Sequence, residues 1–142
     1  MGMMSATQHE LNVFLKLFPE DPNDKILILG SVHDIPIHYD RKFEWFSRLA
    51  PKENVNFRID DINEGDWNVI INCCCEHMVQ MKEVTLSGIY LLQSNDRYHD
   101  HHLNRVTSMD AFRSQCGLDV IYYEDSKEFN GAKYYTIIGE KW

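Results

Sequence analysis

Three residues with the chemistry of acid–base catalysis lie at the end of an apolar stretch that runs from Trp67 to Cys73 (WNVIINC). Asn72 is part of that stretch, and Glu76 and His77 follow it closely. A histidine can accept a proton at neutral pH, and a glutamate beside it can orient the ring or bind a substrate amine. Alternatively, Glu76 starts a short helix whose dipole favours an acid there, while His77 caps or packs. The three residues are therefore a candidate catalytic set with a structural alternative.

Two further runs carry residues that can act as nucleophiles or metal ligands. Cys73, Cys74 and Cys75 are consecutive, so their side chains cannot converge on one partner, and no Lys or Arg adjoins them to lower a thiol pKa. We expect them, like Cys116, to be reduced and buried. The run from Tyr98 to His102 (YHDHH) would need ligands from elsewhere, because adjacent side chains splay apart. It indicates a solvated loop or, alternatively, a substrate lid, and we expect no metal site.

The elements that would position these residues follow from the hydrophobic periodicity. Thr7 and Glu10 have the spacing of a capping box, and apolar residues then recur at helical spacing as far as Pro19. Beyond a loop over residues 19–24, short apolar runs alternate with amphipathic stretches. We predict strands over 25–29, 54–59, 67–73, 89–92, 119–123 and 133–139, and helices over 40–50 and 108–116.

Strands that alternate with helices predict an α/β fold, specifically a shortened Rossmann-like, mostly parallel sheet of five or six strands. The last connection is different, because residues 124–132 are too few for a crossover between parallel strands. We therefore expect the C-terminal strand to be antiparallel. One domain should span residues 1–142, with an N-terminal helix and linker over 1–24 and the α/β core over 25–142.

Charge and composition exclude several classes of partner. The net charge is −8, with 14 basic and 22 acidic residues, and basic residues never cluster beyond a pair, so we expect no nucleic-acid partner. No run approaches the roughly 18 apolar residues of a membrane span, and the first residues lack the pattern of a secretory signal. These observations predict a cytoplasmic protein without a membrane partner. Trp142, at the C-terminus, is a possible contact point in a homo-oligomer.

Three segments resemble class I S-adenosylmethionine-dependent methyltransferases: KILILGS at 25–31, DWNVIINCCCEHM at 66–78 and KYYTIIG at 133–139. Together with LQSN at 92–95, they are most similar to the short methyltransferase-like proteins encoded by tailed phages. The resemblance implies that the cofactor is S-adenosylmethionine and that the partner is a small molecule. It also implies methyl transfer by in-line attack of a substrate nucleophile, with the protein supplying position and proton acceptance.

The resemblance also assigns roles to individual residues. The loop formed by Gly30, Ser31 and Asp34 corresponds to the family's cofactor loop, and Asn72, Glu76 and His77 fall where the family handles substrate. Asp60 and Asp61 follow a predicted strand, at the sheet edge where an acidic side chain would hold the ribose hydroxyls.

Two departures from the family favour another function. The cofactor loop has Gly30 as its one glycine, and the chain is too short for all of the strands and helices that the family usually has. The first alternative is a non-catalytic binding or regulatory module that retains a Rossmann-like fold. The second, which rests on fold analogy alone, is a small-molecule hydrolase or nucleotide-binding variant.

Overall fold

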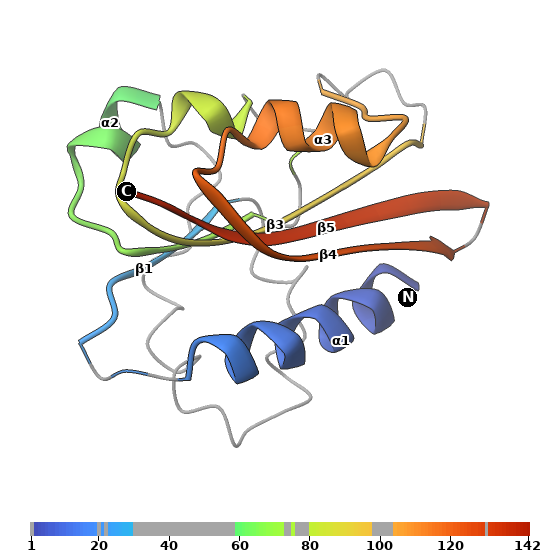
Figure 1. Ribbon diagram of the computed structural model, residues 1–142, viewed down its shortest axis with the longest axis horizontal. Coiled ribbons are helices and arrows are strands. Elements are labelled where there is room, and N and C mark those ends of the chain that lie inside the picture. Colours follow the sequence, from blue (N-terminus) through green and yellow to red (C-terminus); the bar gives the residue numbers. More distant parts are fainter. Residues whose placement is uncertain are drawn as a thin grey trace.

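A computed structural model describes residues 2–19, 21, 23–29, 59–72, 75, 80–97, 104–129 and 131–142. The predicted helix over 40–50 and all but the last residue of the predicted strand over 54–59 lie outside these ranges. In chain order the described elements are α1 (Gly2–Leu17), β1 (Ile26–Leu29), α2 (Ile59–Glu64), β2 (Val69–Asn72), the 3₁₀ helix η5 (Met81–Glu83), β3 (Gly88–Asn95), α3 (Met109–Cys116), β4 (Val120–Phe129) and β5 (Ala132–Lys141) (Figure 1).

The described strands form one five-stranded sheet in the order β1-β2-β3-β5-β4. The pairs β1–β2 and β2–β3 are parallel, whereas β5 is antiparallel to both β3 and β4. The α/β class and the antiparallel C-terminal strand are thus confirmed, and the five strands among the described residues agree with the predicted five or six. The prediction of a mostly parallel sheet is wrong, because the sheet is mixed. Two of its four strand pairs are antiparallel, and these two pairs form the longer ladders.

The prediction of a mostly parallel sheet failed because the two C-terminal strands are longer than the sequence indicated. We predicted a strand over 119–123 followed by a nine-residue connection, but β4 continues to Phe129 and β5 begins at Ala132. The connection is therefore a tight hairpin, in which Gly131 adopts a φ of 77° that is unfavourable for residues with a Cβ. Although β5 is last in sequence, it lies between β3 and β4, so β4 points in the same direction as β3.

One face of the sheet packs against α1 (Figure 1). Phe14 of this helix is buried in a cluster with apolar side chains of β1, β2, β3 and β5: Ile26, Val69, Ile71, Leu91 and Ile138. The helix starts at Gly2, so Thr7 lies in its interior and the predicted capping box is wrong. Glu10, which we had placed in that capping box, is instead a buried residue. The helical spacing of the apolar residues correctly predicted a helix, but it did not locate the residue at which the helix starts.

The opposite face is covered by α2, η5 and α3 (Figure 1). Its cluster includes Ile62 of α2, Met81 of η5, Phe112 of α3 and the sheet residues Leu27, Ile70, Tyr90, Leu92, Tyr135 and Ile137. The helix α3 has the ends that the sequence predicts. The Ser108 hydroxyl accepts a hydrogen bond from the Ala111 N–H, at 3.1 Å, and Gly117 adopts the left-handed conformation with a φ of 61°.

The predicted strand over 54–59 does not extend to its last residue, because Ile59 begins α2. Asp60 and Asp61 therefore belong to this helix. Ile62 anchors this helix to the sheet. In the part of the chain that the structure describes, no helix is long and apolar enough to cross a membrane.

Candidate functional site

The carboxyl ends of β1, β2 and β3 meet at one edge of the sheet, because these strands are parallel. Asn72 ends β2 and pairs with Leu92, so β3 extends beyond it by Gln93, Ser94 and Asn95. Asn72 and these three residues of β3 are all buried. Burying polar groups costs free energy unless they are hydrogen-bonded, so each of these four buried side chains is expected to have a hydrogen-bond partner.

Asn72 lies at the carboxyl end of a central strand, as predicted. Its side-chain N–H₂ group donates to the Met81 sulfur, at 3.2 Å, and its backbone carbonyl accepts from the Cys75 thiol, at 3.3 Å. Asn72 thus links the end of β2 to the η5 segment. Glu76 and His77, the other members of the candidate catalytic set, lie outside the described residues.

The segments that follow β2 and β3 come together at this edge. Gln80 donates from its side-chain amide to the Asn104 side-chain oxygen, at 3.4 Å. The Val106 N–H donates to the Asn95 carbonyl at 3.3 Å, and the Arg105 guanidinium donates to the Asp96 carbonyl at 2.6 Å. The residues that precede and follow segment 98–103 are therefore hydrogen-bonded to each other at the end of β3. The run from Tyr98 to His102, which we interpreted as a solvated loop or a lid, itself lies outside the described residues.

Ser94 differs from its neighbours at this edge. Gln93 donates to the Thr136 hydroxyl at 3.1 Å, and the Asn95 side-chain oxygen accepts from the Arg97 N–H at 3.0 Å. The Ser94 hydroxyl, in contrast, is buried and has no hydrogen-bond partner among the described residues. An unsatisfied buried hydroxyl costs about 1–3 kcal/mol, and a ligand that hydrogen-bonds to it would remove that cost. Ser94 is therefore the described group at this edge that most directly indicates a ligand.

The residues predicted to bind a cofactor are only partly described. Asp60 and Asp61 lie on α2, whereas Gly30, Ser31 and Asp34 lie outside the described residues. Contact of the two aspartates with ribose hydroxyls stays a prediction. The sequence did contain a signal for Ser94 and Asn95, namely the polar residues that follow the apolar run IYLL, but we ended that strand at Leu92.

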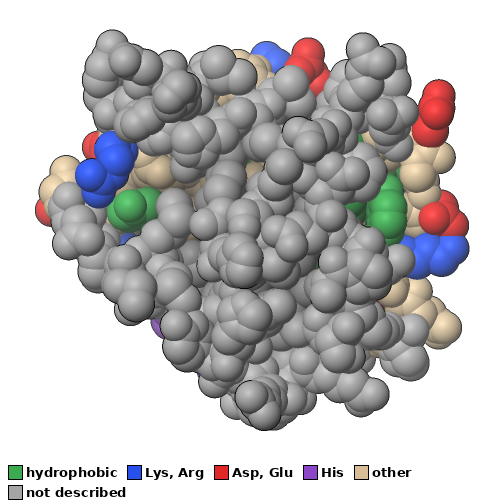
Figure 2. Space-filling model, turned by 180° about the vertical axis from the view of Figure 1, so that it is seen from behind, with side chains coloured by type: hydrophobic (Ala, Val, Ile, Leu, Met, Phe, Trp, Pro, Cys, Tyr) green, Lys and Arg blue, Asp and Glu red, His purple; other side chains and the backbone are tan. Residues whose placement is uncertain are grey.

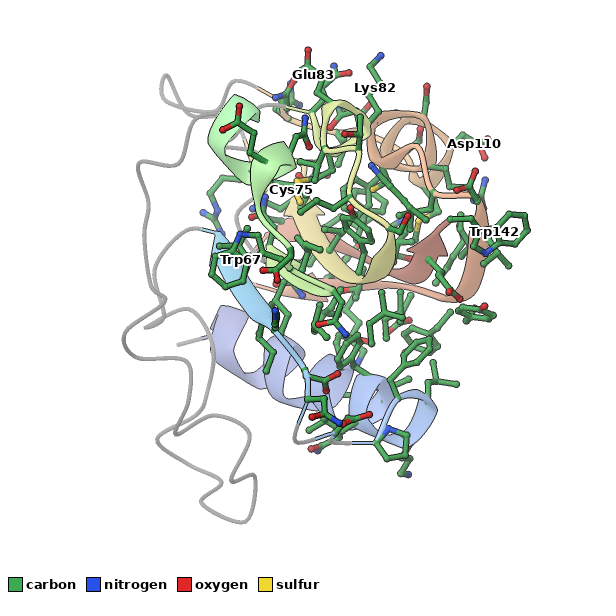
Figure 3. The ribbon with its side chains drawn as sticks, turned by 90° about the vertical axis from the view of Figure 1, so that its left-hand side faces the viewer. Trp67, Cys75, Lys82, Glu83, Asp110 and Trp142 are labelled. Atoms are coloured by element: carbon green, nitrogen blue, oxygen red, sulfur yellow. The ribbon has the colours of Figure 1, made fainter. Side chains whose placement is uncertain are left out.

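The described cysteines behave as expected. Cys75 and Cys116 are free thiols and buried, and burial raises the pKa of the Cys116 thiol to about 12. Cys75 lies between the helical layer and the sheet, whereas Lys82, Glu83 and Asp110 project outward from that layer (Figure 3). Cys73 and Cys74 lie outside the described residues. Both described thiols are thus packing residues rather than nucleophiles.

Two tryptophans lie at opposite sides of the molecule in the same view (Figure 3). Trp67 packs against the α3-side core, whereas Trp142 is 77% exposed. On the face drawn in Figure 2, the charged side chains of the described residues lie near the margins, with acidic and basic groups side by side.

No protein-family model, no curated protein and no solved structure significantly matches this chain. The function is therefore inferred from the geometry of the sheet and its carboxyl edge.

Proposed function

We propose that the chain is an S-adenosylmethionine-dependent methyltransferase-like protein with a shortened Rossmann-like fold, whose ligand lies at the carboxyl edge of β1, β2 and β3. The observation that carries the proposal is the combination of three parallel strands with an antiparallel C-terminal strand. An antiparallel last strand distinguishes methyltransferases from nucleotide dehydrogenases with a similar sheet. Open α/β sheets bind ligands at the carboxyl ends of their parallel strands.

The donors and acceptors described at this edge are uncharged hydroxyl and amide groups. Ser94 offers a hydroxyl that is buried and unsatisfied within the described residues, and the neighbouring groups at the ends of β2 and β3 are amides. Hydroxyl and amide groups recognise amino-acid and nucleoside groups through hydrogen bonds. S-adenosylmethionine, when bound, supplies a methyl group on a sulfonium. The chain's own contribution is to hold the substrate nucleophile in line and to accept its proton, a role that we propose for His77 oriented by Glu76.

A specific observation favours the alternative function, a non-catalytic binding or regulatory module. The side chains of Asn72 and Asn95 bond to the chain's own Met81 and Arg97. Amides that bond to other groups of the same chain can hold this edge in place without taking part in chemistry.

Calorimetric titration with S-adenosylhomocysteine and S-adenosylmethionine separates these two functions. We expect Ser94→Ala to weaken binding by roughly 2- to 10-fold, which corresponds to one neutral hydrogen bond of about 0.5–1.5 kcal/mol. The same variant should raise the melting temperature of the ligand-free protein, because it removes a buried unsatisfied hydroxyl. Ser126→Ala, on the exposed part of β4, is the matched control and should change neither quantity.

Two further variants test the roles of the remaining site residues. Asp61→Ala should weaken binding by the ~1.5–3 kcal/mol of hydrogen bonds to a charged group, whereas His77→Ala should spare binding and lower turnover. If the wild-type chain binds neither compound at millimolar concentration, the methyltransferase proposal fails and the binding module takes its place.

A further inference from the structure

A second group of ionisable side chains lies on the other side of the molecule's sheet, where α1 crosses β4. Alternate residues of a strand point to the same face, so Tyr123, Asp125 and Lys127 of β4 all face α1. The residue of α1 opposite them is Glu10, which is only 2% exposed. Carboxylates are seldom buried to this degree unless they are paired or bind a cation, so the surroundings of Glu10 need an explanation.

The described neighbours of Glu10 satisfy it only in part. The Lys127 ammonium is 3.6 Å from one Glu10 oxygen and 3.6 Å from an Asp125 oxygen, so one cation is shared between two carboxylates. The other Glu10 oxygen is buried and has no hydrogen-bond partner in the described part of the chain. Burial, with Asp125 nearby, raises the pKa of Glu10 to about 7, although Tyr123 and Lys127 act in the opposite direction. The site therefore places two carboxyl groups against one ammonium and one hydroxyl, those of Lys127 and Tyr123, and one Glu10 oxygen is left without a partner.

His9 completes this group from the solvent side. Ligand atoms of His9, Glu10 and Asp125 all lie within 4.8 Å of one another. Ligands of a single ion at metal–ligand distances of ~2.0–2.4 Å can be at most ~4.0–4.8 Å apart. The three donors can thus contact one ion with small side-chain movements. Because His9 is exposed, the ion could enter from solvent, and Lys127, whose side chain is 39% exposed, could turn outward to make room.

We propose that His9, Glu10 and Asp125 form a binding site for a divalent transition-metal ion, with Zn²⁺ as the best match, that joins α1 to β4. One imidazole and two carboxylates are a donor set that Zn²⁺ accepts readily, with a water molecule in the fourth position. The ion would satisfy the unpaired Glu10 oxygen, and Lys127 would compete with it for the two carboxylates. This site is separate from the carboxyl edge, and the inference does not depend on the proposed function.

The test is a titration of the full-length, metal-stripped protein with Zn²⁺ by calorimetry and with Co²⁺ by visible absorption. We expect one site that His9→Ala and Asp125→Asn each weaken by about tenfold or more. Lys127→Met should strengthen binding, because it removes the competing ammonium while keeping the apolar stem. Glu83→Gln, an exposed acid on the opposite side of the sheet, is the control and should leave binding unchanged.

One further readout guards against binding elsewhere in the chain. The Co²⁺ spectrum should lack thiolate charge-transfer bands, since the site contains no cysteine. The proposal is overturned if wild-type protein binds neither ion at millimolar concentration, or if His9→Ala and Asp125→Asn bind as tightly as the wild type.

Discussion

The two faces of the sheet are built differently. On the side of α3, the buried cluster is almost entirely apolar and draws on α2, η5, α3 and four strands. On the side of α1, a smaller apolar cluster adjoins a polar row formed by Gln93, Thr136 and Asp125, which are in register across β3, β5 and β4. Glu10 of α1 lies against the Asp125 end of this row.

This difference has a thermodynamic consequence. Apolar burial depends little on pH. The α3 side also holds the buried Lys141, whose ammonium donates to the Met81 and Val84 carbonyls and whose pKa burial lowers to about 8, so this side should contribute a constant stability at pH values below about 7. The α1 side contains a buried carboxyl group whose ionisation changes near neutral pH, so its contribution should vary with pH. The attachment of α1 is thus the part of the fold that a change of pH between about 4.5 and 7 should modify.

The largest expected effect is on the α3 side. Phe112→Ala should lower the free energy of unfolding by about 3–5 kcal/mol, because this ring is fully buried and its removal leaves a cavity. Urea unfolding at pH 5.5 and pH 7, both below the pKa of Lys141, should give the same loss at both. Leu17→Ala, at the exposed end of α1, is the control and should cost less than ~1 kcal/mol. A loss for Phe112→Ala that changes with pH would contradict the contrast between the two faces.

The next effect concerns Glu10. Its pKa is about 7 in the folded chain against 4.5 as the reference, so the folded state holds more protons between these values. The free energy of unfolding should therefore fall as the pH rises through this window. At about 1.36 kcal/mol per pKa unit, the loss is up to about 3 kcal/mol.

Glu10→Gln should remove this fall, because glutamine does not ionise. The measurement is urea unfolding from pH 4.5 to 8 in the presence of a chelator. The difference between the two proteins isolates Glu10 from His9, Asp125, Lys127 and Tyr123, which are common to both. Parallel pH profiles for wild type and variant would show that Glu10 is not the group responsible.

The smallest effect tests how α3 is held locally. Ser108→Ala should cost about 1 kcal/mol at every pH, because it removes the hydrogen bond to the Ala111 N–H. Ser114→Ala, on the exposed side of the same helix, should instead be neutral or slightly stabilising, since alanine favours helix. Equal effects of the two substitutions in urea unfolding would mean that packing alone, without the cap, determines where α3 begins.

Local patterns in the sequence determined much of this protein. Apolar runs located β1 and β2, and Ser108 and Gly117 marked the two ends of α3, because caps depend on side chains a few residues apart. The short link before the last strand required an antiparallel partner, whatever the rest of the sheet does. The apolar run that precedes Asn72 likewise placed this residue at the end of a strand.

Only the tertiary structure decided the rest, because those features depend on residues far apart in the chain. The place of β5 between β3 and β4 follows from pairing across more than 40 positions, as between Gly88 and Lys141. An even larger separation in the sequence lies between Glu10 and Asp125, so the sequence indicated a helix cap where the fold buries a carboxyl group. Burial and the nearby charge of Asp125 give this side chain its chemistry, and neither is encoded in the residues next to it.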